Sequence, residues 1–269
     1  MLGFFFKKNL CDGWDNLFAL IVSNTLSLVL GFASFFGILA AWAYSPLAAV
    51  LAGILCSGIF MIPVFAWGAN ARKAADFNTP TFATWFRTMK VVWKTALCFG
   101  VLLALFCIVP LYCMYFYLHQ TQLGLFALLL AAVVFWMLLV SFISLQWFIP
   151  LYFLQEENTF KKCLKKSFII FFDNPAFSAV MFVYNIGLFV ISCMLFFFVP
   201  GTSGITLSCT NALRLRLYKY DWLEKMEEKD PGFSQNRDRR AEVPWEELLA
   251  EDKEMLGPRK LSSFLFPWK

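Results

Sequence analysis

The sequence VVWKTALCFGVLLALFCIVPLYCMYFYL, residues 91–118, contains a single charged side chain, that of Lys94. A helix needs roughly 20 predominantly apolar residues to cross a bilayer, so this stretch predicts a transmembrane helix. The rest of the chain agrees, because 60% of its residues are hydrophobic and only 15% are charged, against roughly 25% charged residues in a soluble domain. The sequence therefore predicts an all-α polytopic membrane protein.

Other apolar stretches extend this prediction. Four are similarly long, at 17–44, 46–67, 123–154 and 175–199. A further one, 202–213, is uncharged but short, and it has to continue to Leu217 in order to cross. The first stretch exceeds the ~7–15 apolar residues of a secretory signal and is followed at once by another span, so we expect it to be retained. About six transmembrane helices are predicted.

The charges of the connections give the expected orientation. Cationic side chains gather in alternate connections: Lys7 and Lys8; Arg72, Lys73, Arg87 and Lys90; Lys161, Lys162, Lys165 and Lys166; and Arg214, Arg216 and Lys219. The turns between them, at 44–46, 119–122 and 200–204, carry no formal charge. Because cytoplasmic loops are enriched in Lys and Arg, we expect three hairpins with both termini in the cytoplasm.

The cytoplasmic connections also predict helices that lie in the membrane interface. Residues 81–93 and 160–168 place aromatic and cationic side chains at helical spacing, which is typical of amphipathic interfacial helices. With the basic segment at 6–8, they suggest three repeats of an interfacial helix followed by a hairpin. The alternative is that any inner loop is basic and aromatic. Asn16 and Asn174 precede two spans as candidate helix caps.

The chain is expected to divide into a transmembrane bundle at 1–217 and a cytoplasmic charged tail at 218–269. In the tail, Pro244 suits the first turn of a short amphipathic helix and Gly257 its end. The candidates for docking are aromatic: Trp245, Phe264, Phe266 and Trp268. We expect the tail to fold back, its acids facing the basic loops around Arg87 and Lys161. The alternative is a disordered tail that binds a partner.

The sequence resembles the YesL-like family of small bacterial integral membrane proteins. The resemblance rests on Asn24-Thr25-Leu26-Ser27-Leu28, on Thr81-Phe82-x-x-Trp85-Phe86-x-x-x-Lys90, and on the basic stretch 160–166. It covers residues 1–217, and the long tail looks like an addition. The resemblance implies the bacterial cytoplasmic membrane and an accessory role beside a carbohydrate ABC transporter. It implies no catalytic residues.

Amides inside the spans are the candidate ligand-binding groups: Asn24, Gln146, Asn185 and Asn211. Buried amides in membranes commonly bond across helices, so their ordinary role is to hold helices together. The sharper hypothesis is a central polar site for a sugar-like or lipid-headgroup ligand. No ionisable residue lies deep in a predicted span, which disfavours proton-coupled or ion-coupled transport.

Catalysis is not predicted. Gly201-Thr202-Ser203-Gly204 has the form of an intramembrane serine protease motif, but such a serine needs a base, and the single histidine, His119, precedes it. The sequence lacks a nucleotide-binding G-x-x-x-x-G-K-[ST] motif and any C-x-x-C pair. We expect no metal, cofactor or nucleic-acid partner, and a lipid bilayer around the chain.

The sequence thus favours a non-enzymatic membrane protein, an accessory or scaffold subunit that binds another membrane protein such as an ABC transporter permease. The alternative is a small transporter or channel with a polar intramembrane ligand site.

Overall fold

The structure, a computed structural model, describes residues 1–120, 122, 124–156, 158–231, 233 and 243–259, and this part of the chain contains helices and no strand. The helices are α1 (Leu2–Asp15), α2 (Leu17–Trp42), α3 (Pro46–Ala75), α4 (Phe82–Leu118), α5 (Leu125–Leu145), α6 (Phe148–Leu154), α7 (Phe160–Asp173), α8 (Pro175–Met194), α9 (Gly201–Lys229), α10 (Trp245–Leu248) and α11 (Ala250–Leu256).

Five segments in this described part are long and apolar enough to cross a membrane: α2, α3, α4, α8, and α5 together with α6. By length and composition the chain is therefore an all-α membrane protein, as predicted. The polar helix α9 is not among the five, so the sixth crossing remains a prediction.

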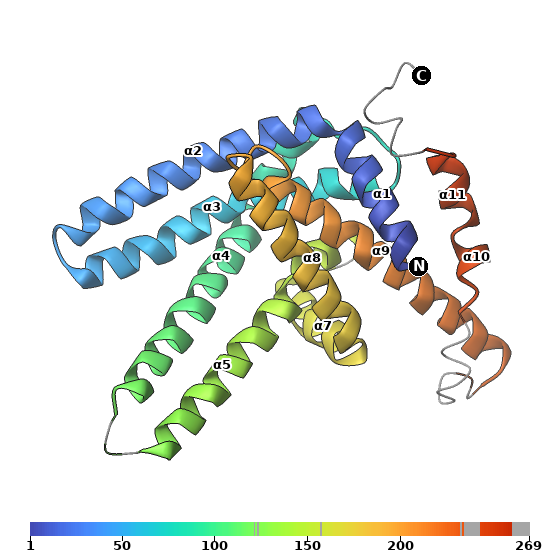
Figure 1. The fold of residues 1–269 in the computed structure, drawn as a ribbon. Helices are drawn as coiled ribbons and strands as arrows, with labels where there is room; N and C mark the ends of the chain where they lie inside the picture. The colour runs from blue at the N-terminus through green and yellow to red at the C-terminus, as the bar shows by residue number, and fades with distance from the viewer. Residues whose placement is uncertain (121, 123, 157, 232, 234–242, 260–269) are drawn as a thin grey trace.

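Two long hairpins extend away from a shared centre (Figure 1). One consists of α2 and α3, the other of α4 and α5, and the two hairpins diverge toward their turns. Helix α9 runs through the centre, where it packs against α1, α2, α3, α6 and α8. From this central position, α9 connects these five helices to one another.

The two hairpins are joined where α3 crosses α4. The Ser57 hydroxyl donates a hydrogen bond of 2.9 Å to the Gly100 carbonyl. A Cβ atom on Gly100 would lie 2.4 Å from the Ser57 carbonyl oxygen, and one on Gly58 would lie 3.2 Å from the Leu97 side chain. Glycine is therefore required at position 100, because only its missing side chain lets the two backbones approach so closely.

Three of the helices have a serine or threonine hydroxyl as their N-cap. Ser45 accepts a hydrogen bond from the amide of Ala48 at the start of α3, and Thr81 and Thr159 cap α4 and α7 in the same way. These bonds satisfy amide groups that have no partner within the first turn of a helix.

The two asparagines expected to cap helices do not form capping hydrogen bonds. Asn16 and Asn174 do precede α2 and α8, but neither side chain caps the helix that follows. Instead, the Asn16 amide donates to the carbonyl of Asp12 at 2.8 Å, at the end of α1.

The predicted interfacial helices are present in part. Helices α1 and α7 are separate amphipathic helices, whereas the predicted segment at 81–93 is the start of α4 and runs into its span without a break. The predicted span at 123–154 is interrupted near Gln146, where α5 ends, and α6 follows.

The tail contains the predicted helix, and the helix folds back onto the bundle. It is divided into α10 and α11, and it ends at Gly257 with a φ of 68°. Leu249, Asp252 and Leu256 are buried. They share one face at helical spacing, so α11 docks through a single stripe.

The docking surface differs from the expected one. Asp252 contacts Arg214 of α9, with two N–O distances of 2.9 and 3.1 Å, rather than the basic residues of α4 and α7. Arg259 pairs with Asp15 of α1 at 2.5 Å. Trp245 packs partly buried against the core. The other docking candidates, Phe264, Phe266 and Trp268, lie outside the described residues.

Candidate functional site

Helix α9 carries a row of buried polar side chains, and neighbouring helices supply their partners. Three clusters follow one another along it. The first cluster comprises Ser23, Asn24, Ser27, Thr202 and Ser203; the second comprises Gln146, Asn185, Ser208 and Cys209; the third comprises Lys8, Asn9, Asp12 and Asn211. Each cluster contains at least one of the amides that the sequence singled out, so the four candidates are distributed along α9 and do not form one site.

Asn24 is the centre of the first cluster. Its amide nitrogen donates to the carbonyls of Phe198 and Pro200 at 2.9 and 2.8 Å. Its amide oxygen accepts the backbone N–H of Ser203 at 3.0 Å and the Thr202 hydroxyl at 3.4 Å. A residue of α2 therefore caps the first turn of α9, and its amide has no group left for a ligand.

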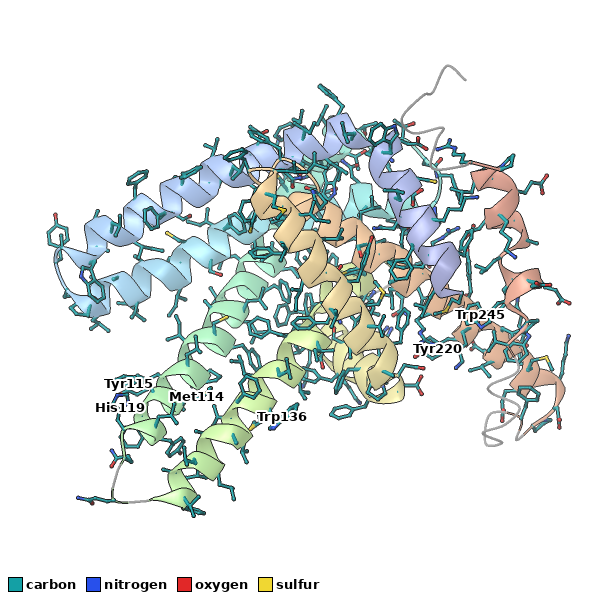
Figure 2. The ribbon with its side chains drawn as sticks, in the orientation of Figure 1. Met114, Tyr115, His119, Trp136, Tyr220 and Trp245 are labelled. Carbon is teal, nitrogen blue, oxygen red and sulfur yellow. The ribbon has the colours of Figure 1, made fainter. Side chains whose placement is uncertain are left out.

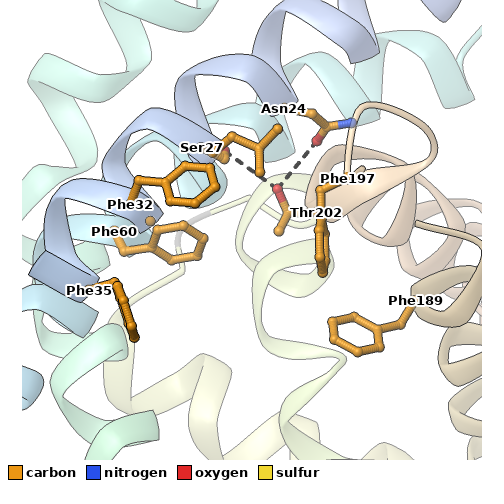
Figure 3. Close-up of a pocket in the computed structure, with 10 residues that line it drawn as sticks. Asn24, Ser27, Phe32, Phe35, Phe60, Phe189, Phe197 and Thr202 are labelled. Atoms are coloured by element: carbon orange, nitrogen blue, oxygen red, sulfur yellow. Dashed lines mark hydrogen bonds between the residues drawn. The ribbon is translucent and has the colours of Figure 1, made fainter. Parts of the chain in front are cut away.

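A cavity of about 550 Å³ lies beside the first cluster, between α2, α3, α8 and the start of α9. Figure 3 shows Thr202 bonded to Asn24 and Ser27 at one end, with phenylalanines around the remaining wall. The phenylalanines are Phe32, Phe35, Phe60, Phe189 and Phe197. Its volume is in the range of small-molecule sites, but the lining is suited to an apolar occupant.

The second cluster brings two predicted candidates into direct contact. The Asn185 amide nitrogen donates to Gln146 Oε1 at 3.2 Å, and its oxygen accepts the Ser208 hydroxyl at 2.9 Å. Gln146 Nε2 donates to the carbonyls of Ile143 and Ser178. A smaller cavity of about 290 Å³ touches Gln146, Asn185 and Thr202. Thr202 therefore lies on the walls of both cavities.

The third cluster contains a buried ion pair. Lys8 Nζ lies 2.9 Å from Asp12 Oδ2, and both side chains are almost fully buried. The Asn211 amide nitrogen donates to the same carboxylate at 2.9 Å and to Asn9 at 3.2 Å. The ammonium of Lys8 also lies 3.6 Å from the centre of the Phe77 ring. These contacts hold α1 against α9.

Burial perturbs both charged groups of this pair. Loss of water raises the pKa of Asp12 and lowers the pKa of Lys8, because each charged form is better solvated in water. The mutual attraction of the two charges opposes both pKa shifts, and the hydrogen bond from Asn211 also opposes the shift of Asp12. The position of the pair beside Asn211 was not predicted. The i,i+4 spacing of Lys8 and Asp12 was the available signal.

Arg214 adds a charged contact one turn beyond Asn211. Its guanidinium binds Asp252 of α11 and also lies 3.0 Å from Asp76 at the end of α3. Tyr218 stacks beside it, and burial raises the pKa of the Tyr218 hydroxyl to about 12. The sequence placed Arg214 at a membrane boundary without naming these partners.

The serine protease hypothesis finds no geometric support. Ser203 is buried, and its hydroxyl donates to the Ser23 hydroxyl at 2.8 Å. His119 lies beside Tyr115 at the far end of α4 (Figure 2), where its Nδ1 lies 2.8 Å from the Tyr115 carbonyl. Among the described residues, no group of His, Cys, Asp and Glu could hold a metal ion.

Comparison with protein-family models, with curated proteins and with solved structures found no match to this chain. The functional argument therefore rests on the sequence and the structure of this chain. Its amides are bonded to protein groups, and the chemistry they perform is to hold helices together.

Proposed function

We propose that the chain is a non-enzymatic accessory or scaffold subunit that assembles with another integral membrane protein. The support comes from the two long hairpins, whose extensive apolar surface is not covered by any other described part of the chain. The class of partner comes from the YesL-like resemblance, which implies the permease of a carbohydrate ABC transporter.

Helices α3 and α4 diverge after they cross, and this divergence supports the proposal most directly. The helices touch at Gly58 and Gly100 and separate beyond that point (Figure 1). The separated halves expose large apolar side chains: Leu47, Leu51 and Leu55 on α3, and Val109, Tyr112, Tyr115 and Phe116 on α4. Protein interfaces are enriched in aromatic residues, so we propose that a helix of the partner packs between the two hairpins.

The proposed setting is the bacterial cytoplasmic membrane, with both termini in the cytoplasm. The basic residues near α1, the end of α3, α7 and the second half of α9 would then lie on one side, in accordance with the charge bias of cytoplasmic loops. Six crossings in three hairpins would give this orientation, and so would any arrangement in which α8 and α9 enter and leave on the same side.

Site-directed photo-crosslinking in native membranes tests the proposal. A photoreactive phenylalanine replaces Leu55 or Tyr112, and Phe172 of α7, which is 69% exposed, provides a matched control. We expect the first two positions to form an adduct of one discrete mass that contains a transporter permease, and the control to lack it. Adducts with lipid alone, or with a second copy of this chain, would contradict the proposal.

A small transporter or channel remains the second candidate, because Gln146 and Asn185 line a cavity. It is less well supported, since the amides of both residues already bind protein groups. Stabilisation of the purified monomer by a sugar would favour the transporter, whereas a stoichiometric membrane partner favours the accessory subunit.

A further inference from the structure

The turn between α8 and α9 differs in composition from the other hairpin turns. Its residues, Leu195-Phe196-Phe197-Phe198-Val199-Pro200, are all apolar. Phe196 is 78% exposed and the preceding Met194 is 75% exposed. The turn of α2 and α3 contains Ser45, and that of α4 and α5 contains His119 and glutamines. An exposed apolar tip is favourable in hydrocarbon and unfavourable in water.

The turn also lies far from the outer end of the neighbouring hairpin. Asn24 of α2 bonds directly to Phe198 and Pro200, and α2 continues from Asn24 to Trp42. That length is about 27 Å at ~1.5 Å per residue. Even at a tilt of roughly 40°, the steepest of the usual range, about 20 Å of depth separates the turn from the end of α2.

The depth of the turn also follows from its distance to α1, which contacts both α8 and α9. Helix α1 exposes an apolar stripe of Leu2, Phe6, Leu10 and Trp14, which is the pattern of a helix lying in the membrane interface. Asn9 of this helix bonds to Tyr184 of α8 and to Asn211 of α9. From these residues, each arm extends about 15 Å to the turn at ~1.5 Å per residue, which is about half of a ~30 Å hydrocarbon layer.

The backbone of the turn is satisfied by the protein itself. Asn24 binds the carbonyls of Phe198 and Pro200 and the amide of Ser203, and the Ser192 hydroxyl accepts from the amide of Gly201 at 2.9 Å. A turn in water would have no need of these side chains. Irregular backbone at membrane depth is tolerated only where protein groups or enclosed water satisfy it, and these bonds provide that.

The geometry points to a re-entrant hairpin. We propose that α8 and α9 enter the membrane from the side of α1, turn about halfway through the hydrocarbon layer, and return to the same side. The chain then crosses the membrane four times, through α2, α3, α4 and α5. Asn24 is a positioning residue that holds the turn at this depth. The proposal is independent of the partner, and it preserves the sidedness proposed above.

Cysteine labelling of the full chain tests the depth of the turn. Phe196→Cys is compared with Tyr44→Cys and His119→Cys, two exposed positions in the other turns, and with the parent chain, whose eight cysteines set the background. With a membrane-impermeant maleimide on intact cells, we expect labelling of the two control variants above the parent. Phe196→Cys should stay at the parent level in intact cells and in inverted vesicles, and should react only after denaturation.

A nitroxide attached to Phe196→Cys provides a second readout in reconstituted membranes. A tip in hydrocarbon is accessible to oxygen and protected from a water-soluble nickel complex, and we expect this result. Labelling from outside at the level of His119→Cys, or equal nickel accessibility at the two positions, would overturn the proposal in favour of a full crossing. Neither result would affect the crosslinking test for a partner.

Discussion

Asn24 is a single side chain that satisfies three backbone groups and one hydroxyl from another hairpin. Its position in α2 was evident from the sequence, because an amide inside an apolar span has few ordinary reasons to be there. Its partners were not evident, since Phe198 and Pro200 lie far along the chain in a turn without polar side chains. The structure places Asn24 in a capping role.

Replacement of Asn24 by Leu should lower the free energy of unfolding by about 2 kcal/mol, because three backbone bonds are lost at ~0.6 kcal/mol each. Unfolding in mixed micelles measures the change. Thr25→Val is the matched control, because the Thr25 hydroxyl bonds only within its own helix. Equal stability of the two variants would refute the capping role.

The buried Lys8–Asp12 pair is expected to affect the free energy of unfolding through its charges. Lys8→Met should cost about 3–5 kcal/mol, because it leaves a buried carboxylate without its partner. The double variant Lys8→Met with Asp12→Leu should recover most of this loss, since no uncompensated charge remains. Unfolding of both variants in the same micelles provides the comparison, and a double variant as unstable as the single one would contradict the expectation.

At the scale of elements, the crossing of α3 and α4 depends on Gly100. Gly100→Ala should destabilise the protein by about 1–3 kcal/mol, which is typical of overpacking, because the new methyl group meets backbone atoms of α3. Gly37→Ala is the control, since open space surrounds that position. The thermal midpoint in detergent distinguishes the two, and equal midpoints would show that the helices can separate without cost.

Asp252 provides a buried charged contact for the docking of the tail helix, in addition to the exposed Arg259–Asp15 pair. Asp252→Ala should increase hydrogen exchange of the amides in α11 about 10-fold, because the variant loses the charge-assisted bonds to Arg214, which are worth roughly 1.5–3 kcal/mol, while Arg214 keeps Asp76 as a partner. Glu251→Gln, at an exposed position of the same helix, should leave exchange unchanged. Unaltered protection in Asp252→Ala would mean that the remaining contacts of the tail, which include Leu249, Leu256 and the Arg259–Asp15 pair, hold the helix without Asp252.

The sequence predicted elements better than their contacts. The apolar runs predicted α2, α3, α4 and α8 because the bilayer imposes a length that can be counted. Arg87 and Lys161 were expected to receive the tail, whereas Arg214 does so. A charge count finds basic residues, but it cannot show which of them lies within contact distance of the tail helix. The terminal aromatic cluster lies outside the described residues and stays a prediction.

For the whole molecule, the proposed orientation predicts where fusions report. A reporter fused after Lys269 should show cytoplasmic activity, because α8 and α9 enter and leave on one side in either arrangement considered. A fusion after His119 is the control and should report the opposite side. Periplasmic activity of the fusion after Lys269 would contradict both the six-crossing and the re-entrant arrangements.

The burial of polar side chains along α9 determines the order in which the chain is assembled during synthesis. A helix that carries Ser203, Ser208 and Asn211 has little tendency to leave the translocon for lipid by itself. Its partners on α1, α2 and α8 are all made earlier, so they are in place when α9 emerges from the ribosome. We therefore expect α9 to be inserted after the other helices. A defect in α1, α2 or α8 should first be detected as an α9 that stays on the cytoplasmic side of the membrane.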